Sequence, residues 1–310
     1  MRFIRTAVAA AVLGLALSST AQAGDKGFEV AITVDDLPSH GSVPPGVSRI
    51  DVARDYLAGL TAHKVPQVYG FVNAIGVQKD PATLEALKMW RAAGYPLGNH
   101  TFSHMNITSG TLEAFEADLE AGEPVIRDLM GDQDWRVLRF PYLSAAGNNP
   151  AIHAGIMAYL KDHHYRIADV SMGYSDWAYT DTYARCMAKG DTAAVEAMKV
   201  QYMNGVAVSI KRGLALSQKV YGRRIPFVVL MHEGAFSALM LPKVLDVYEA
   251  AGARFISLDQ AQSDPAYAET DAKAGEGDLI VRTAQAKGIN LWGGDIPADV
   301  DVSNLDKMCR

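Results

Sequence analysis

The sequence predicts an α/β fold in which parallel strands are covered by helices. Short apolar runs typical of buried strands alternate with longer stretches whose apolar residues recur at helical spacing. The alternation begins with the run at residues 28–34 and continues to the run at 254–257. Repeated β–α units form either a barrel or a doubly wound sheet, and the pattern by itself leaves both open.

The expected elements follow one another along most of the chain. Strands are predicted at residues 28–34, 68–72, 95–99, 137–140, 165–170, 227–231 and 254–257. Helices are predicted at residues 47–63, 81–93, 111–130, 150–162, 191–218 and 242–251, three of which start near a proline. Beyond residue 265 the pattern dissolves into Ala/Gly/Asp-rich sequence, which we interpret as a tail that packs on the domain.

The N-terminus has the organisation of a secretory signal peptide. A positive segment at residues 1–5 precedes an apolar run at 7–19, which ends in Ala21-Gln22-Ala23, a small-x-small cleavage site. We therefore expect residues 1–23 to be removed and the protein to be periplasmic or secreted. The alternative is an uncleaved anchor, but the apolar run is short for a transmembrane helix.

The composition of this chain of 310 residues argues against two classes of binding partner. Its formal net charge is −6 and it contains no Lys/Arg run, which argues against nucleic acid and anionic membranes as partners.

The two cysteines, Cys186 and Cys309, both lie in the part of the chain expected to be exported, where a disulfide can form. A disulfide and two free thiols both remain open on the sequence alone.

Polar residues follow several of the predicted strands, where parallel β–α folds carry their chemistry. The first strand runs directly into Asp35 and Asp36. One of these acids can bind a metal while the other accepts a proton. The alternative is a turn or helix-capping acid before Leu37-Pro38.

A pair of histidines opens the loop after the third strand. One turn of helix would place His100 and His104 on one face, with both rings able to reach one cation. No glutamate follows His100, which excludes the H-E-x-x-H motif. With Asp36 the two imidazoles form a three-ligand set, as expected of a catalytic divalent metal site.

Two further strands end in candidate catalytic groups. Arg139 can hold a carboxylate by a bidentate pair, and Pro141 fixes the backbone before Tyr142, whose N–H could serve as an oxyanion donor. His232 follows the strand at 227–231. Taken singly, an ordinary strand end and a structural histidine explain these residues as well.

Together these residues resemble the polysaccharide deacetylase family, the NodB-homology domain of carbohydrate esterase family 4. The resemblance covers residues 28–259 and consists of five short motifs in the family's order. They are Thr33-Val-Asp-Asp36, His100-Thr-Phe-Ser-His104, Arg139-Phe-Pro-Tyr142, Ser175-Asp176-Trp177 and Leu230-Met231-His232.

The first two motifs carry the family's base and metal. The resemblance implies that Asp35 is the catalytic base, and that Asp36, His100 and His104 bind a divalent metal. Zn²⁺ is the expected ion, with Co²⁺, Ni²⁺ or Mn²⁺ as alternatives.

The other three motifs carry the acid and the substrate groove. Arg139 orients the base, Tyr142 stabilises the oxyanion through its N–H and contacts substrate, and Asp176 lies beside Arg139 or His232. Trp177 forms a groove wall, Leu230 lines the acetyl pocket, and His232 is the general acid.

The resemblance also implies a distorted (β/α)7-type barrel at residues 24–265, the catalytic domain, followed by a tail at 266–310. The implied reaction is metal-dependent hydrolysis that removes acetyl groups from a poly- or oligosaccharide, with N-acetyl groups as the expected target.

Two departures from the family motifs affect the substrate groove. Leu143 replaces the usual glycine of the third motif, and Leu37-Pro38-Ser39-His40 replaces the residues that usually follow the first motif. A same-fold hydrolase of small amides and an inactive carbohydrate-binding relative remain alternatives.

Five histidines match no motif and are expected to be surface or core residues. His40 differs from the others because it lies four residues after Asp36, where it could touch metal or substrate. The five histidines outside the motifs are His40, His63, His153, His163 and His164.

Overall fold

The computed structural model describes residues 27–268 and 276–310. A seven-stranded sheet lies at its centre, in the order β5-β4-β3-β2-β1-β6, with β7 paired to β1. All the strand pairs in these described ranges are parallel. The strands are β1 Phe28–Leu37, β2 Tyr69–Val72, β3 Leu97–Asn99, β4 Val137–Leu138, β5 Arg166–Ile167, β6 Phe227–His232 and β7 Ala253–Phe255.

The sheet curls until its two ends meet. After β5 the chain continues to Met172, which forms a parallel bridge with Val229 of β6. The backbone N–H of Leu230 donates to the carbonyl of Met172 at 3.0 Å. The prediction of a distorted barrel of seven parallel strands is confirmed.

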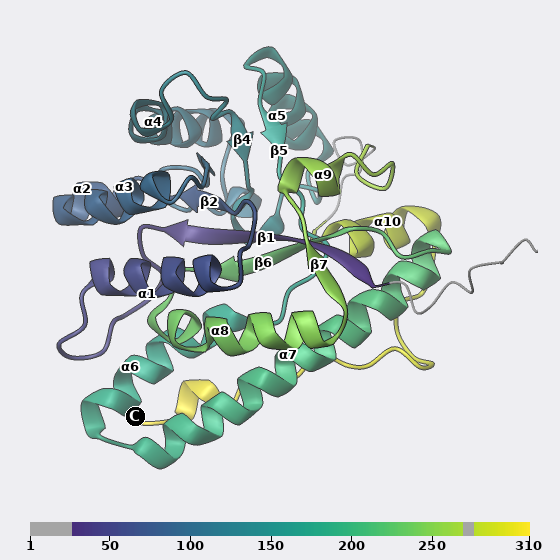
Figure 1. Ribbon diagram of the computed structural model, residues 1–310. Coiled ribbons are helices and arrows are strands. Elements are labelled where there is room, and N and C mark those ends of the chain that lie inside the picture. The colour runs from purple at the N-terminus through teal and green to yellow at the C-terminus, as the bar shows by residue number, and fades with distance from the viewer. Residues whose placement is uncertain (1–26, 269–275) are drawn as a thin grey trace, which may run out of the picture.

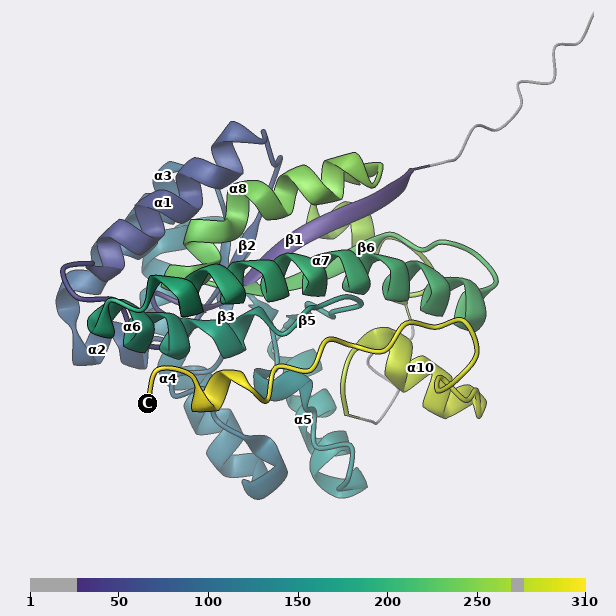
Figure 2. The same cartoon turned by 90° about the horizontal axis from the view of Figure 1, so that it is seen from below.

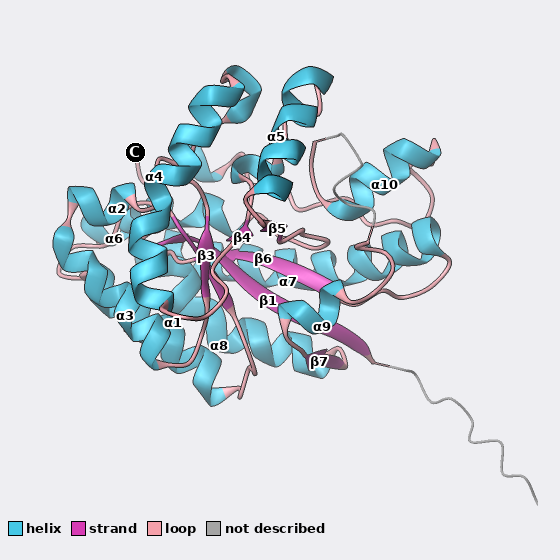
Figure 3. Cartoon of the chain, turned by 90° about the horizontal axis from the view of Figure 1, so that it is seen from above, coloured by secondary structure: helices cyan, strands magenta, loops and turns pink. Residues whose placement is uncertain are grey.

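Helices surround the curled sheet (Figure 1, Figure 3). The helix α1 packs against α8, and α7 packs against both α8 and α10. The α-helices are α1 Arg49–Ala62, α2 Ile75–Lys79, α3 Leu84–Ala92, α4 Leu112–Met130, α5 Pro150–Asp162, α6 Thr180–Lys189, α7 Thr192–Tyr221, α8 Ala235–Ala250, α9 Leu258–Gln262 and α10 Leu279–Lys287. Short 3-10 turns include Pro141–Leu143 and Asp176–Tyr179.

The core lies between the sheet and this helical layer. All four residues of β2 are buried, as are the apolar residues of β1. Gly98 of β3 is required by this packing, because a Cβ there would lie 2.6 Å from the Phe71 ring and 2.7 Å from the carbonyl oxygen of Val137. The near-continuous apolar runs therefore reflect strands covered by protein on both faces.

Three sequence-based expectations about local structure are wrong. The helix predicted from residue 242 begins at Ala235, because Pro242 lies inside α8 and does not start it. The segment from His100 to His104 is a loop and not a helical turn. The region beyond residue 265 contains α10, whose N-cap Asp278 accepts a hydrogen bond from Val281 N. In each case tertiary packing outweighs the local pattern.

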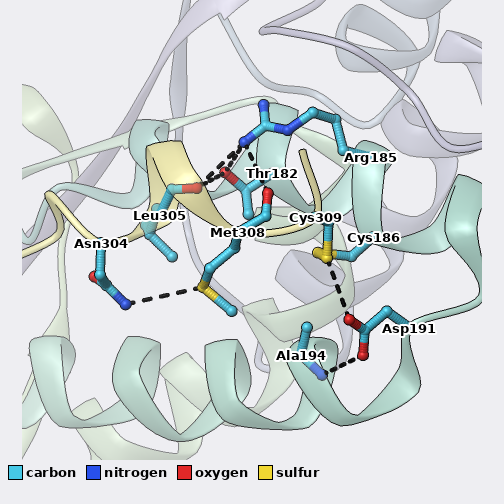
Figure 4. The surroundings of a disulfide bond; sticks show 9 residues. All are labelled: Thr182, Arg185, Cys186, Asp191, Ala194, Asn304, Leu305, Met308 and Cys309. Atoms are coloured by element: carbon cyan, nitrogen blue, oxygen red, sulfur yellow. Dashed lines mark hydrogen bonds between the residues drawn. A yellow bond between two sulfur atoms is a disulfide. The ribbon is translucent and has the colours of Figure 1, made fainter.

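The C-terminal segment runs along α7 towards α6 (Figure 2). Arg212 of α7 donates to the carbonyl of Pro297, and Gln201 donates to that of Asp301. Near the end of the chain, Thr182 donates to the carbonyl of Leu305, and a disulfide joins Cys186 of α6 to Cys309 (Figure 4). Of the two states left open by the sequence, the structure has the disulfide.

Two expectations concern the membrane and the N-terminus. Across residues 27–268 and 276–310, every helix is too short or too polar to cross a bilayer. The signal peptide predicted at residues 1–23 lies outside the described residues. The boundary between a domain at 24–265 and a tail at 266–310 stays a prediction.

Candidate active site

The carboxyl ends of β1, β3, β4 and β6 converge on one pocket of about 490 Å³. Most of the side chains singled out from the sequence meet here, although they come from motifs far apart along the chain. The pocket is lined by Asp35, Asp36, His40, His100, His104, Phe140, Tyr142, Leu143, Trp177, Leu230 and His232. Arg139 and Asp176 lie behind this lining, in contact with Asp35 and His232 respectively.

Asp35 is held by the buried guanidinium of Arg139. Arg139 Nη1 lies 3.1 Å from Asp35 Oδ1 and 3.3 Å from Oδ2. The rest of the guanidinium is fixed as well, since Nε donates to the carbonyl oxygen of Ala168 and Nη2 donates to Thr33 Oγ1. Both side chains are almost fully buried, so the pair is screened little by solvent.

Asp36, His100 and His104 form a cluster that fits a metal ion. Asp36 Oδ1 lies 3.5 Å from Nε2 of each histidine, and one ligand atom from each residue lies within 4.8 Å of the others. Asp36 Oδ1 is buried and has no hydrogen-bond partner. His100 Nδ1 lies 2.7 Å from the carbonyl oxygen of Arg139, which leaves Nε2 to face the cluster. An orphaned carboxylate oxygen beside two imidazole nitrogens suits a divalent cation.

The surroundings keep these ligands in their binding-competent forms. Burial alone would raise the pKa of Asp36, but the hydrogen bond from His40 and the nearby His100 and His232 hold that pKa well below its usual range. Burial, together with His100, lowers the pKa of His104. An ionised carboxylate and a neutral imidazole are the forms that bind metal.

His232 forms a pair with the buried carboxylate of Asp176. His232 Nδ1 lies 2.9 Å from Asp176 Oδ1, and the backbone N of His232 donates to Oδ2 at 2.7 Å. Ser237 Oγ donates to the same Oδ2 at 3.2 Å. Burial disfavours the imidazolium, but the carboxylate of Asp176, together with those of Asp36 and Asp35, outweighs burial and raises the pKa of His232 to about 9. The imidazole is therefore mostly protonated at neutral pH.

Two exposed aromatic side chains border the pocket. The Tyr142 ring packs edge-on against His104 with centroids 4.6 Å apart, and Tyr142 is 61% exposed. Trp177 is 53% exposed and lies on the side of His40, whose Nε2 is 3.1 Å from the Trp177 carbonyl oxygen. Leu230 of β6 adds an apolar surface inside. This arrangement of a polar floor between aromatic walls is typical of a ligand site.

The backbone around the pocket is held in unusual conformations. Non-glycine residues rarely adopt positive φ, and such outliers concentrate at functional sites. The site residues with this conformation are Asp36 (65°), Thr101 (58°), His104 (59°), Tyr142 (59°), Leu143 (52°) and Ser175 (56°). The left-handed φ of Leu143 explains why a glycine would suit that position.

Comparison with known proteins identifies the family. Residues 23–166 match the family model described as "Polysaccharide deacetylase". These matched residues belong to the polysaccharide deacetylase family. No curated protein matches the chain at a significant level.

Solved structures share the fold of this chain at low sequence identity. A mutant of a CE4 family pseudoenzyme, with restored enzymatic activity, is 16% identical and has a TM-score of 0.51, over 76% of this chain and 68% of that one. The wild-type pseudoenzyme from Bacillus anthracis is 15% identical, at 0.50, over 76% and 66%. A polysaccharide deacetylase from Bacillus cereus is 18% identical, at 0.50, over 74% and 91%. At this level of identity, the similarity shows a shared fold.

Some residues that shape the site were not assigned a role from the sequence. Thr33 contacts Arg139, and this could have been anticipated, because Thr33 and Asp35 are two residues apart on one strand and share a face. Glu233 lies buried behind the pocket, where Trp90 Nε1 donates to its Oε2 at 2.8 Å. Nothing in the local pattern indicates that contact, which joins residues 143 positions apart.

Proposed function

We propose that this protein is an exported, metal-dependent deacetylase that removes N-acetyl groups from a poly- or oligosaccharide. One observation carries the proposal. Asp35, held by Arg139, lies 3.6 Å from Nε2 of His100, so a potential base borders the Asp36, His100 and His104 cluster. A binding module has no need of a base beside a metal site.

Asp36, His100 and His104 would hold the metal through Oδ1 and the two Nε2 atoms. A bound divalent cation would polarise the acetyl carbonyl and lower the pKa of a water molecule. Zn²⁺ suits one carboxylate and two imidazoles with open positions, and Co²⁺, Ni²⁺ or Mn²⁺ are alternatives.

Asp35 would take the proton of the attacking water at its carboxylate. Arg139 contacts both carboxylate oxygens through Nη1, which fixes their orientation. Arg139 is itself held by Thr33 and Ala168 and so cannot follow the base. Turning Asp35 away from the pocket would therefore break both of its contacts with Arg139.

His232 would complete the reaction as the general acid. Its Nδ1 donates to Asp176, so Nε2 is the atom that passes a proton to the leaving amine. The Tyr142 backbone N–H would stabilise the developing oxyanion, and such a donor contributes about 3 to 4 kcal/mol. Leu230 would line the space taken by the acetyl methyl group.

The surroundings of the pocket support a glycan outside the cytoplasm. Exposed Tyr142 and Trp177 offer flat apolar surfaces next to the polar floor, suited to the faces of sugar rings. The disulfide between Cys186 and Cys309 favours an oxidising compartment, in agreement with the predicted signal peptide.

The proposal is tested by acetate release from N- and O-acetylated glycans, comparing chelator-stripped and Zn²⁺-loaded protein. We expect release from an N-acetylated glycan that is lost on stripping and restored by metal. Metal binding at one equivalent without release from any glycan would reject the proposal. Glycan binding without release would then favour a carbohydrate-binding protein, and turnover of small acetamides alone would favour a small-amide hydrolase.

A further inference from the structure

The segment at residues 38–42 brings one histidine into the pocket. Ser39 N donates to the carbonyl of Asp36 at 2.8 Å, and His40 N donates to that of Glu233 at 2.9 Å. Further on, Ser42 N donates to Asp181 Oδ1 at 2.7 Å. Gly41 has a φ of +62°, and a Cβ there would lie 2.9 Å from Thr180. The segment is therefore fixed at both ends, against β6 and against the start of α6.

The two ring nitrogens of His40 contact two different parts of the site. Nδ1 donates to Asp36 Oδ2 at 2.7 Å, and Nε2 lies 3.1 Å from the carbonyl oxygen of Trp177. The ring also packs against His232, with centroids 4.9 Å apart. His40 thus bridges a proposed metal ligand and an aromatic wall of the pocket.

The contact with Asp36 distinguishes its two carboxylate oxygens. Oδ2 is engaged by His40, whereas Oδ1 faces Nε2 of both His100 and His104 and has no hydrogen-bond partner. The terminal torsion of an aspartate is soft, so an unrestrained carboxylate would sample several orientations. Hydrogen bonds to the non-ligating atoms of metal ligands restrict this freedom.

We infer that His40 is a positioning residue that holds Asp36 through Nδ1 and the Trp177 wall through Nε2. The inference deepens the proposed function, on which it rests for the role of Asp36 as a ligand. It assigns a purpose to Leu37-Pro38-Ser39-His40, the departure from the usual first motif.

Two amide substitutions separate the two contacts. The amide nitrogen of asparagine is as many bonds from Cβ as Nδ1 of histidine, and that of glutamine is as many as Nε2. His40→Asn therefore keeps a donor for Asp36, and His40→Gln keeps a donor for the Trp177 carbonyl. His163→Gln is the control, because His163 lies outside the pocket, where its Nδ1 is 2.9 Å from the carbonyl oxygen of Tyr159.

The first readout is the Kd of Co²⁺ for the chelator-stripped protein by calorimetry, which needs no substrate. We expect His40→Gln to weaken binding by about 10- to 100-fold, and His40→Asn and His163→Gln to bind within about threefold of the wild type. The melting temperature of each variant shows whether it is folded. If His40→Gln bound Co²⁺ as tightly as the wild type, the inference that Nδ1 positions Asp36 would be wrong. It would also be wrong if His40→Asn lost as much Co²⁺ affinity as His40→Gln.

The second readout concerns Trp177 and uses a glycan that the wild type deacetylates. We expect His40→Asn to raise KM about fivefold or more with kcat little changed, because the loss falls on ground-state binding. An unchanged KM would overturn the contact with Trp177. If the wild type releases acetate from no glycan, the proposed function fails, whereas the Co²⁺ affinities still decide the contact with Asp36.

Discussion

Asp35 and Asp36 are neighbours in the chain, yet their carboxylates have different partners. Asp35 Oδ1 lies 3.1 Å from Arg139 Nη1, and Asp36 Oδ1 lies 3.5 Å from Nε2 of both His100 and His104. Successive side chains of a regular strand point to opposite faces. The pairing of β1 with β2 is irregular between Val34 and Leu37, and Asp36 has a φ of 65°. This local turn lets both acids reach one pocket.

The different partners predict different losses on mutation. We expect Asp35→Asn to lower kcat by about 10²- to 10⁴-fold while one equivalent of Zn²⁺ stays bound, because only the base is removed. His104→Ala is expected to lose both metal and turnover. Acetate release and metal content of dialysed protein check both. Activity near the wild-type level in Asp35→Asn would contradict its assignment as the base.

The activity should fall at alkaline pH as His232 loses its proton. Against the effect of burial, the carboxylates of Asp176, Asp36 and Asp35 raise the pKa of His232 to about 9, and a cation bound nearby would bring this pKa lower. The falling limb of the kcat profile is thus expected at or below about pH 9. Asp176→Asn removes the negative charge, so the limb should move to lower pH. The pH dependence of acetate release measures this, and an unmoved limb would show that another group sets it.

Glu233 should make the protein less stable as the pH rises. Burial raises the pKa of this carboxyl from 4.5 to about 8, so between these values the unfolded chain binds fewer protons than the folded one. The free energy of unfolding therefore falls with rising pH. Glu233→Gln removes this dependence. The free energy of unfolding of the variant minus that of the wild type should therefore increase by about 3 to 5 kcal/mol from pH 4.5 to 8.

Urea unfolding of both proteins at several pH values tests this prediction. Glutamine keeps an oxygen that accepts the hydrogen bond of Trp90 Nε1. Glu85→Gln, at an exposed position of α3, is the control and should show no such trend. A parallel pH dependence of Glu233→Gln and the wild type would show that Glu233 is ionised in the folded protein.

The disulfide between Cys186 and Cys309 should contribute strongly to stability. It joins residues 123 positions apart, and the chain-entropy model gives a loop of this length up to about 4 to 5 kcal/mol. We expect the double Cys186→Ser, Cys309→Ser variant to melt at a lower temperature than the oxidised wild type, and close to the reduced one. Thiol titration of the denatured, oxidised protein should find no free thiol, and two would contradict the disulfide.

The order of strands and most helices was predictable because burial and period are local properties of the sequence. The strand predicted at 227–231 is β6 Phe227–His232, and the helix predicted at 150–162 is α5 Pro150–Asp162. The prediction of helix bounds failed where one local signal is compatible with two structures. Pro242 resembles a helix start, yet it lies inside α8, where Leu241 before it and Val244 after it are buried.

The candidate site was predicted more fully than its surroundings. All the residues singled out for a role contribute to the pocket or contact its lining, because their types and strand-end positions are visible in the chain. The conformation of residues 100–104 was not visible. Positive φ values at Thr101 and His104 bring the two rings together without a helical turn.

By itself the sequence determined the fold class, the strand ends that carry polar residues, and the chemical types available for base, acid and metal ligands. Only the tertiary structure decided which of them touch. His40 reaches the carbonyl of Trp177 from 137 positions away, and Trp90 reaches Glu233 across 143. Such contacts depend on strand register and on how loops pack, which are set by the whole chain and not by a local pattern.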